Sequence, residues 1–500
     1  MDTSGVDGLV SSLKAITSDL VEALPFTGLR ELPRVAAKPR LSWPPLRIGS
    51  LEVPVPIVQG GMGVGISLHR LASAVADAGA VGVVAANGIG LLEKDYYRDG
   101  RAANLRAFRR EIRAARQRTR GVIGVNIMVA VSDFHQLLDV AIEEKVDLVF
   151  MGAGLPIKGL PLDRMRAASV RPVPIVSSVR AVEMIFRMWQ KIYNDVPDAV
   201  VFEGPLAGGH IGFSAEQVDD PAYQLEAIVP GIVEALKPFE SRFGRRIPVI
   251  AGGGIYTGED IYAALELGAA AVQMGTRFVA TDECDADAAF KQAYVDATEQ
   301  EIGLIHSPVG MPGRAIRNDF IRASEQGQSP AFKCAWQCLA ACKADDANYC
   351  ISIALNNARK GNLRHGFVFA GANAFRVDKI VTADTLVSEL AQAFARRAEE
   401  RTVARLEGLV TLLKDLRGQY DAVGLRVRQL SSAYEAVLRT RIRDATDAGI
   451  AGAREQYDSA LARVRQQYDS ALGGFRALQF QIAENLADAW AVLNGPALQS

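Results

Sequence analysis

Eight short apolar runs alternate with stretches of helical periodicity between residues 46 and 280, and this alternation is the strongest constraint on the fold. The runs are rich in valine, isoleucine and alanine, which is typical of strands buried on both faces of a parallel sheet. They lie at residues 55–59, 81–84, 122–126, 147–151, 173–177, 199–203, 247–251 and 270–274. Since eight βα units are the number that closes a (β/α)8 barrel, we predict an α/β protein of the TIM-barrel class.

The segments between these runs carry the apolar stripes of barrel helices. Residues 68–78, 134–144 and 258–267 each place apolar side chains on one helical face. Residues 101–120 are rich in arginine but have the same kind of stripe, so we interpret them as a solvated helix. The net charge of −1 gives no electrostatic footprint for nucleic acid or an anionic membrane, and we expect a small-molecule substrate.

The breaks in the alternation divide the chain into five parts. These are an N-terminal extension (1–46), the barrel (47–280), a mostly helical insertion (281–366), a segment that completes the barrel (367–398) and a C-terminal helical domain (399–500). The insertion follows the eighth strand and precedes the last barrel helix, so we expect it to lie as a lid over the mouth of the barrel.

An internal repeat marks the C-terminal helical domain. Residues 456–461 recur as residues 467–472, an interval of eleven residues. Such an interval keeps an apolar seam nearly straight along a helix. We expect a helical hairpin that packs on the barrel or on a partner subunit, which makes a homo-oligomer through these helices our prediction. The alternative is an arm that recruits another protein.

The composition predicts a cytoplasmic protein. The N-terminus lacks a basic start followed by an apolar core, and no window of about 18 residues is uninterruptedly apolar. Five cysteines in 500 residues do not form a disulfide framework, and we expect them to be reduced.

The apolar run at residues 199–203 leads through Gly208 and Gly209 to His210. His210 therefore follows the carboxyl end of a strand, the edge at which parallel α/β folds place their chemistry. The two glycines allow the backbone to approach a flat ligand closely. An isolated loop histidine is usually a packing residue, but the glycine-rich loops elsewhere on this edge favour a catalytic role for His210.

Glycine-rich loops follow three more of the predicted strands. The seventh strand runs into Gly252, Gly253 and Gly254, and the eighth into Gly275 and Thr276, the two places where barrels bind phosphate. The remaining candidates line the same edge, and they are Gly61, Met62 and Gly63 after the first strand, Asn126 at the end of the third, and Ser177 at the end of the fifth. No lysine follows the glycines after the first strand at the spacing of a nucleotide P-loop, so we exclude that motif. The paired phosphate loops, together with an Asn126 amide that can bond a heteroaromatic ring, predict a mononucleotide with a flat ring, such as FMN.

These motifs resemble the nitronate monooxygenase family, formerly called 2-nitropropane dioxygenases. The resemblance covers about residues 46–390, and its motifs occur at residues 56–63, 124–126, 207–210, 251–255 and 274–278. The family is in turn similar to the flavin-dependent enoyl-ACP reductases. The resemblance implies an FMN-binding barrel in which Gly252–Gly254, Gly275 and Thr276 bind the phosphate.

In such enzymes the residues matching Gly61, Met62, Gly63 and Asn126 flank the flavin ring, and the histidine matching His210 lies beside it. In nitronate monooxygenases this histidine takes a proton from a nitroalkane or holds a nitronate, and a carbonyl compound and nitrite are released. In the enoyl reductases NAD(P)H is the electron donor. Ser177 and Ser178 are weaker candidates, since small polar residues also cap helices.

These motifs and the resemblance leave three alternative functions. Our first choice is an FMN-dependent, nitronate monooxygenase-like oxidoreductase with His210 as the catalytic residue. The second is an NAD(P)H-dependent enoyl-thioester reductase. In the third, the C-terminal helices make the chain a flavin-bearing assembly or partner-binding protein.

The insertion departs from the simple forms of the family. Cys334, Cys338 and Cys342 recur every four residues, which predicts one stripe along a helix, with Cys350 folding back towards it. Four thiolates suit zinc or an iron–sulfur cluster, but on a continuous helix the outer two lie about 12 Å apart. We therefore interpret them as packed, reduced thiols and predict no metal.

His306 and Arg314 also lie in the insertion. We interpret both as structural residues of the lid, with binding of an anionic group at the mouth of the barrel as the alternative.

Overall fold

The computed structural model describes residues 42–444 apart from 330, 335, 341 and 344–346, and beyond them residues 15, 459, 462–463, 465–467, 469–478, 480–482 and 485. Most of the predicted N-terminal extension and much of the eleven-residue repeat lie outside the described residues. The chain divides into two units, one of residues 42–395 and the other of residues 1–41 and 396–500.

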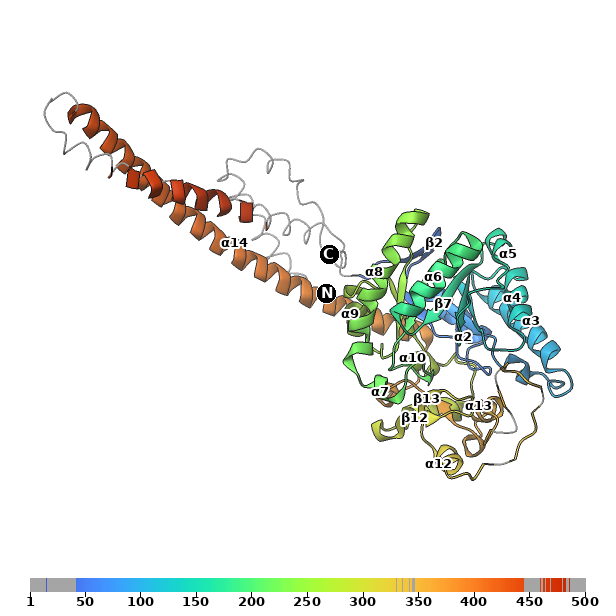
Figure 1. Ribbon diagram of the computed structural model, residues 1–500. Helices are drawn as coiled ribbons and strands as arrows, with labels where there is room; N and C mark the ends of the chain where they lie inside the picture. The colour runs from blue at the N-terminus through green and yellow to red at the C-terminus, as the bar shows by residue number, and fades with distance from the viewer. Residues whose placement is uncertain are drawn as a thin grey trace. The chain divides into compact units, whose positions relative to one another are not determined.

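Eight parallel strands form the predicted barrel in the order β3-β11-β10-β8-β7-β6-β5-β4 (Figure 1). They are β3 (Ile57–Gln59), β4 (Gly82–Ala85), β5 (Ile123–Met128), β6 (Leu148–Gly152), β7 (Arg171–Val176), β8 (Val200–Glu203), β10 (Val249–Gly252) and β11 (Ala271–Met274). The circle closes between β3 and β4, where Val58 bridges to Val81 and the amide of Gln59 donates to the Val81 carbonyl at 3.0 Å. All eight predicted strands are confirmed.

Helices surround the barrel, as their apolar stripes indicate (Figure 1). They are α2 (His69–Asp77), α3 (Gly100–Arg118), α4 (Phe134–Glu143), α5 (Leu162–Ala167), α6 (Val179–Tyr193), α8 (Leu225–Phe243) and α9 (Gly258–Glu266). The arginine-rich α3 buries Phe108 and Ile112 and pairs its arginines with neighbouring carboxylates, so it is a solvated barrel helix.

Inward-pointing side chains fill the barrel from its N-terminal end. Val58, Val201 and Ile250 pack there with Phe150, whose ring lies opposite Gly124. A Cβ atom at Gly124 would come within 2.8 Å of this ring, so the glycine makes the space that the phenylalanine fills. The hairpin of β1 (Leu46–Ile48) and β2 (Leu51–Val53) closes the same end. The open end is therefore the one at the carboxyl ends of the strands.

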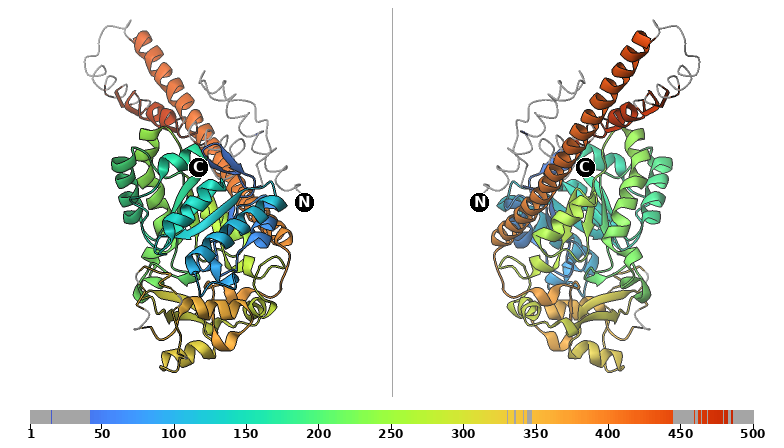
Figure 2. Two further views of the ribbon diagram at one scale, coloured as in Figure 1. Left: turned by 90° about the vertical axis from the view of Figure 1, so that its right-hand side faces the viewer. Right: turned by 90° about the vertical axis from the view of Figure 1, so that its left-hand side faces the viewer.

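The insertion is less helical than we predicted. It contains α11 (Ala288–Val295), α12 (Asp319–Glu325) and α13 (Ile351–Arg359), but also the antiparallel strands β12 (Ile302–His306) and β13 (Pro312–Ile316). Strand β13 pairs further with β14 (Val368–Phe369) and β9 (Gly209–His210). These partners lie far away in the sequence, which is why periodicity within the insertion did not reveal the strands. Figures 1 and 2 show the insertion at one end of the barrel.

The last barrel helix continues without a break into the C-terminal part, because α14 spans Ala383–Asp444. Described residues between 462 and 485 are also helical. The rings of Tyr420 and Phe475 lie 4.6 Å apart, so the two helical segments pack together as the expected hairpin does. Self-association through these helices stays a prediction.

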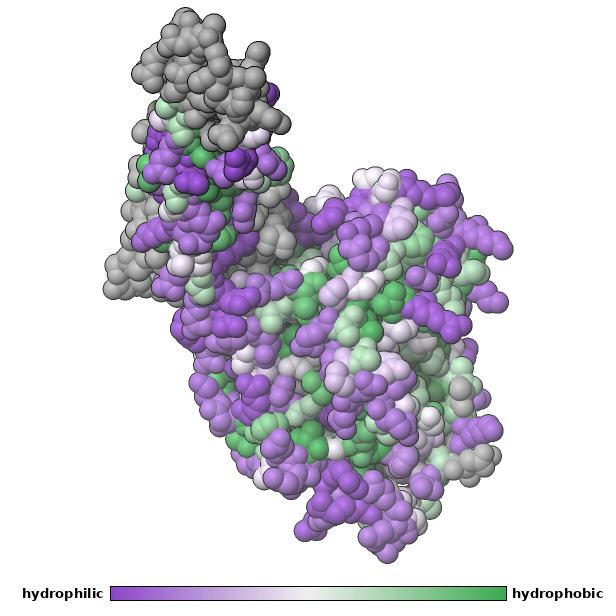
Figure 3. All heavy atoms as spheres, turned by 60° about the vertical axis from the view of Figure 1, so that its left-hand side comes forward, coloured by the Kyte–Doolittle hydropathy of each residue, from purple (hydrophilic) through white to green (hydrophobic). Residues whose placement is uncertain are grey.

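Among the described residues, no helix combines the length and the apolarity needed to cross a bilayer. On the face shown in Figure 3, hydrophilic side chains predominate, with apolar ones scattered between them.

Phe150→Ala tests the packed barrel interior. Phe150 is 1% exposed, and removing its ring should lower the free energy of unfolding by about 3–5 kcal/mol, which includes the energy of the cavity left behind. Urea titration followed by circular dichroism measures this change. Met184→Ala, at a position 39% exposed on α6, is the control and should change it by less than about 0.5 kcal/mol. An equal effect of both substitutions would contradict a packed interior around Phe150.

Candidate active site

A cavity of about 550 Å³ lies at the open end of the barrel. Each barrel strand contributes a residue at or just beyond its carboxyl end, and the insertion adds Tyr294, Met311, Leu339 and Ile351. The insertion thus walls the cavity, as a lid over the mouth requires. Its size falls within the usual range for a cofactor or drug-sized ligand, about 300–1,000 Å³.

All predicted site residues except Gly252 line this cavity. They are Gly61, Met62, Gly63, Asn126, Ser177, Gly208, Gly209, His210, Gly253, Gly254, Gly275 and Thr276. Gly252 is the last residue of β10, and its carbonyl accepts the Gly204 amide at 2.8 Å. Because Gly252 has no side chain, it leaves open space on the cavity floor between its neighbours on β8 and β11.

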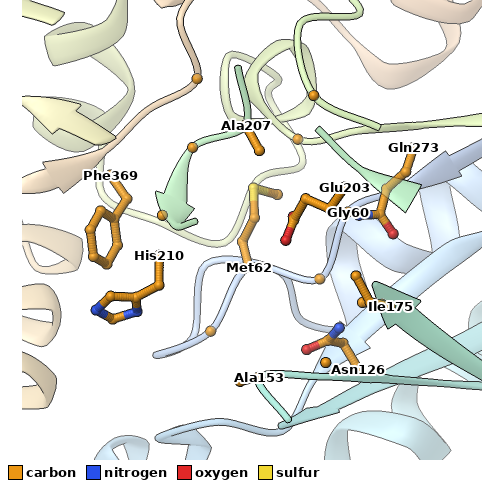
Figure 4. Close-up of a pocket in the computed structure, with 18 of the residues that line it drawn as sticks. Gly60, Met62, Asn126, Ala153, Ile175, Glu203, Ala207, His210, Gln273 and Phe369 are labelled. Atoms are coloured by element: carbon orange, nitrogen blue, oxygen red, sulfur yellow. The ribbon is translucent and has the colours of Figure 1, made fainter. Parts of the chain in front are cut away.

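Two polar side chains flank Gly252 on the floor. Gly252 is in register with Glu203 on β8 and with Gln273 on β11, so all three point to the same side of the sheet. Glu203 and Gln273 therefore project into the barrel mouth across a position that has no side chain. Figure 4 shows both near Asn126, around the same space. Reasoning from the sequence missed this pair, although Glu203 ends a predicted strand.

Glu203 is the acidic group of the floor. Desolvation by burial raises the pKa of its carboxyl from 4.5 to about 7. Among the described residues it has no hydrogen-bond partner, so its carboxyl is available to a ligand in the cavity. Near neutral pH it can therefore both donate and accept a hydrogen bond.

The rim loops are glycine-rich because side chains would fill or strain them. Gly253 has φ +93°, and a Cβ atom there would lie 2.7 Å from the Gly204 carbonyl oxygen. At Gly61 a Cβ atom would lie 2.2 Å from the Cβ atom of Asn126. These positions keep the backbone open where a flat ring and a phosphate would approach, so the residues present fit a flavin mononucleotide.

Residues 369–373 form a further wall that ties the rim loops together. The side-chain amide of Asn373 donates to the Gly254 carbonyl at 2.7 Å, and the Gly371 amide donates to the Thr276 hydroxyl at 3.2 Å. Both predicted phosphate loops are thus held by a segment that follows the insertion. Sequence reasoning named neither contact, because both link residues about 100 positions apart.

His210 lies in strand β9 rather than on a free turn. Its backbone pairs with Gly313 of β13, and its Nε2 atom lies 2.7 Å from the hydroxyl of Ser307. The ring of Phe369 packs against the imidazole edge-on, with centroids 5.0 Å apart. Desolvation lowers the pKa of His210 from 6.5 to about 4, so its imidazole is neutral at physiological pH.

The other polar residues considered from the sequence lie outside the cavity or at its edge. Arg314 is buried and donates to the carbonyls of Pro205 (2.5 Å) and Ala207 (2.9 Å), so it braces the turn before His210. His306 is exposed at the end of β12. Ser178 lines the cavity and also caps α6, accepting the Ala181 amide at 3.2 Å. Among the described residues that line the cavity, none is lysine or arginine.

Comparisons with known proteins agree with this geometry. A model of the nitronate monooxygenase family matches residues 45–393. A curated carboxyl-CoA dehydrogenase from Rhodococcus jostii, named for a hydroxy-methyl-oxo-octahydroindene substrate, is 28% identical over 270 residues, which span 54% of this chain and 65% of the relative.

Two solved structures are also similar to this chain in sequence and in fold. FabK from Thermotoga maritima is 29% identical, with a TM-score of 0.54, over 71% of this chain and 96% of that one. A nitroalkane oxidase from Streptomyces ansochromogenes is 26% identical, also with a TM-score of 0.54, over 69% of this chain and 97% of that one.

Glu203→Gln tests the buried carboxyl. Between pH about 4.5 and 7 the folded protein holds a proton that the unfolded chain has released, so this group makes the protein less stable as the pH rises through that range. Without cofactor, the variant should be more stable than the wild type at pH 8, on the order of 1–3 kcal/mol, and the gain should vanish near pH 4.5. Thermal and urea unfolding across pH measure it.

The control for this experiment is Glu183→Gln on the exposed face of α6, which should leave the pH dependence of the wild type unchanged. If Glu203→Gln raised the free energy of unfolding by the same amount at every pH, this result would contradict a buried carboxyl that titrates.

Proposed function

The chain belongs to the nitronate monooxygenase family, and we propose that it is a flavin-dependent oxidoreductase that reduces the carbon–carbon double bond of an enoyl thioester. Family membership supports the oxidoreductase class. Nitronate oxidation was the first choice from the sequence and the enoyl reductase the second. The polarity of the cavity around His210 reverses that order.

The observation that carries the proposal is the absence of a cation beside the substrate position. Neither lysine nor arginine occurs among the described cavity-lining residues, and burial keeps His210 neutral. A nitronate anion would lie there without a partner of opposite charge, which is costly in a desolvated site. An imidazole with so low a pKa is also a weak base for a nitroalkane proton. An uncharged thioester meets neither difficulty.

A neutral imidazole suits a thioester because it can polarise a carbonyl group. When Ser307 donates its hydroxyl proton to Nε2, the imidazole proton lies on Nδ1, and that nitrogen can donate a hydrogen bond to the thioester oxygen. The pairing of β9 with β13 and the edge-on ring of Phe369 hold the imidazole in place. His210 would thus stabilise the charge that develops on the thioester oxygen during reduction.

The cavity also offers groups for the cofactor. Backbone groups of Gly253, Gly254, Gly275 and Thr276 would hold the phosphate, whereas Met62, Asn126, Glu203 and Gln273 would contact the ring and the sugar-alcohol chain. A bound FMN would supply the hydride chemistry, with NAD(P)H as the proposed electron donor. No cationic side chain is needed when backbone N–H groups bind the phosphate.

The relatives support a thioester substrate. The Rhodococcus jostii dehydrogenase is named for a carboxyl-CoA, which is a thioester. Nitronate oxidation remains the second candidate, because the family model and the nitroalkane oxidase structure favour it.

His210→Ala tests the role of the imidazole. Reduction of an enoyl thioester should fall about 100-fold, the usual loss when one donor to a developing oxyanion is removed. Flavin content should stay as in the wild type, because His210 lies on the substrate side of the cavity. Steady-state kinetics with absorbance of the bound flavin measure both. His306→Ala, at an exposed position outside the cavity, should change neither. Unchanged turnover in His210→Ala would contradict the assignment.

Anaerobic reduction distinguishes the two chemistries. With a reductase, NADPH should bleach the flavin under nitrogen, and crotonyl-CoA should then restore its colour. With a nitronate oxidase, ethyl nitronate rather than NADPH should bleach the flavin under nitrogen. Nitrite should then appear once air is admitted. Bleaching by the nitronate but not by NADPH would overturn the proposed reductase.

A further inference from the structure

A second cavity, of about 430 Å³, is lined by Cys334, Cys338, Cys342 and Cys350. The remaining cysteine, Cys284, lies elsewhere, buried against the barrel. Four of the five thiols in the chain therefore face one space that the proposed reaction does not use. The thiol of Cys338 lies close enough to the other three to interact with them electrostatically.

The segment that carries these cysteines is not the helix that their spacing predicts. Among the described residues from 331 to 350 there is no helix, and the one strand-like contact is a bridge between Leu339 and Val131. The Ser132 amide donates to the Cys338 carbonyl at 3.0 Å, and the Ala340 amide donates to the Ala130 carbonyl at 2.9 Å. This tether to the loop after β5 replaces helical hydrogen bonds. On a straight helix Cys334 and Cys342 would lie about 12 Å apart, and this distance no longer argues against a ligand that they share.

Polar groups lie close to two of the four thiols. Cys350 occupies the N-cap position of α13, and the backbone N–H groups of Ser352 and Ile353 lie near its sulfur. The sulfur of Cys338 lies 3.7 Å from the hydroxyl of Ser352. N–H and O–H dipoles aimed at sulfur are the contacts that hold metal-bound thiolates.

A single metal ion does not match this arrangement. In the described part of the chain, no three His, Cys, Asp or Glu side chains gather closely enough to hold one ion. A zinc ion needs all its sulfurs at about 2.3 Å. An iron–sulfur cluster binds each thiolate through a separate iron, so its four sulfurs stand farther apart around a larger inorganic core.

We propose that Cys334, Cys338, Cys342 and Cys350 bind a 4Fe–4S cluster in this cavity. The proposal replaces the sequence-based interpretation of packed thiols, which relied on a helix that does not form. It does not depend on whether the substrate is a thioester or a nitronate.

The place of the cavity gives such a cluster a function. Leu339, Ile351 and Ser352 line both this cavity and the one at the barrel mouth, so the two share a wall. A cluster there would be next to the proposed flavin. Each oxidised cluster takes up one electron on reduction, so the chain would store one electron more than its flavin alone.

The test is a metal and sulfide analysis of the full chain, purified without oxygen and with its flavin bound. We expect about four irons and four acid-labile sulfides per chain, and a paramagnetic signal of the reduced cluster after dithionite. Titration with dithionite should consume one electron per chain beyond those taken by the flavin.

The double variant Cys338→Ser/Cys350→Ser should lose most of the iron and sulfide and the additional electron. Cys284→Ser is the matched control and should keep all three, because Cys284 lies outside this cavity. Flavin content and the circular dichroism spectrum show whether each variant has folded.

Four results would overturn the proposal. The first is a wild-type protein that stays free of iron and sulfide even after anaerobic incubation with ferrous iron, sulfide and a thiol reductant. The second is stoichiometric zinc in place of iron, and the third is a disulfide between these cysteines in the anaerobic protein. The fourth is a folded double variant that retains its iron.

Discussion

The alternation of side chains along the strands of the closed barrel determines which residues line the cavity at its mouth. Side chains alternate between the inside and the outside of the barrel, so one residue near the carboxyl end of each strand must face the mouth. On β8, β10 and β11 these residues are Glu203, Gly252 and Gln273, which are in register. Because the middle residue is a glycine, the floor has open space between a carboxyl and an amide. A one-residue shift would turn both groups towards the helices.

The pairing of β9 with β13 completes the site from a distant part of the sequence. This contact aligns His210 with Gly313 and brings Ser307 to the imidazole, while Arg314 braces the turn before it. The insertion therefore forms the cavity wall around His210, which the proposed function assigns to the substrate, and the barrel rim forms the part that it assigns to the cofactor.

Local patterns predicted the barrel, and longer-range contacts explain what they missed. The eight strands and the rim glycines follow from apolar runs and their neighbours, which a single stretch of sequence reveals. Whether Glu203 faces the mouth depends on its register with β10, and the strands of the insertion depend on β9 and β14. The four-residue spacing of the cysteines suggested a helix, but hydrogen bonds to the loop after β5 hold that segment irregular. In each case the tertiary partner overrode the local pattern.

Identification of the bound cofactor tests most directly whether the barrel mouth holds a flavin. The purified protein should be yellow, and heat or acid should release FMN at about one molecule per chain, identified by chromatography and mass. Replacing Gly253 by leucine should abolish this binding while the chain stays folded, because a side chain there would strain the backbone and meet the Gly204 carbonyl. A colourless protein that takes up no FMN, or a leucine variant that keeps its full flavin, would contradict the cavity's assignment as the cofactor site.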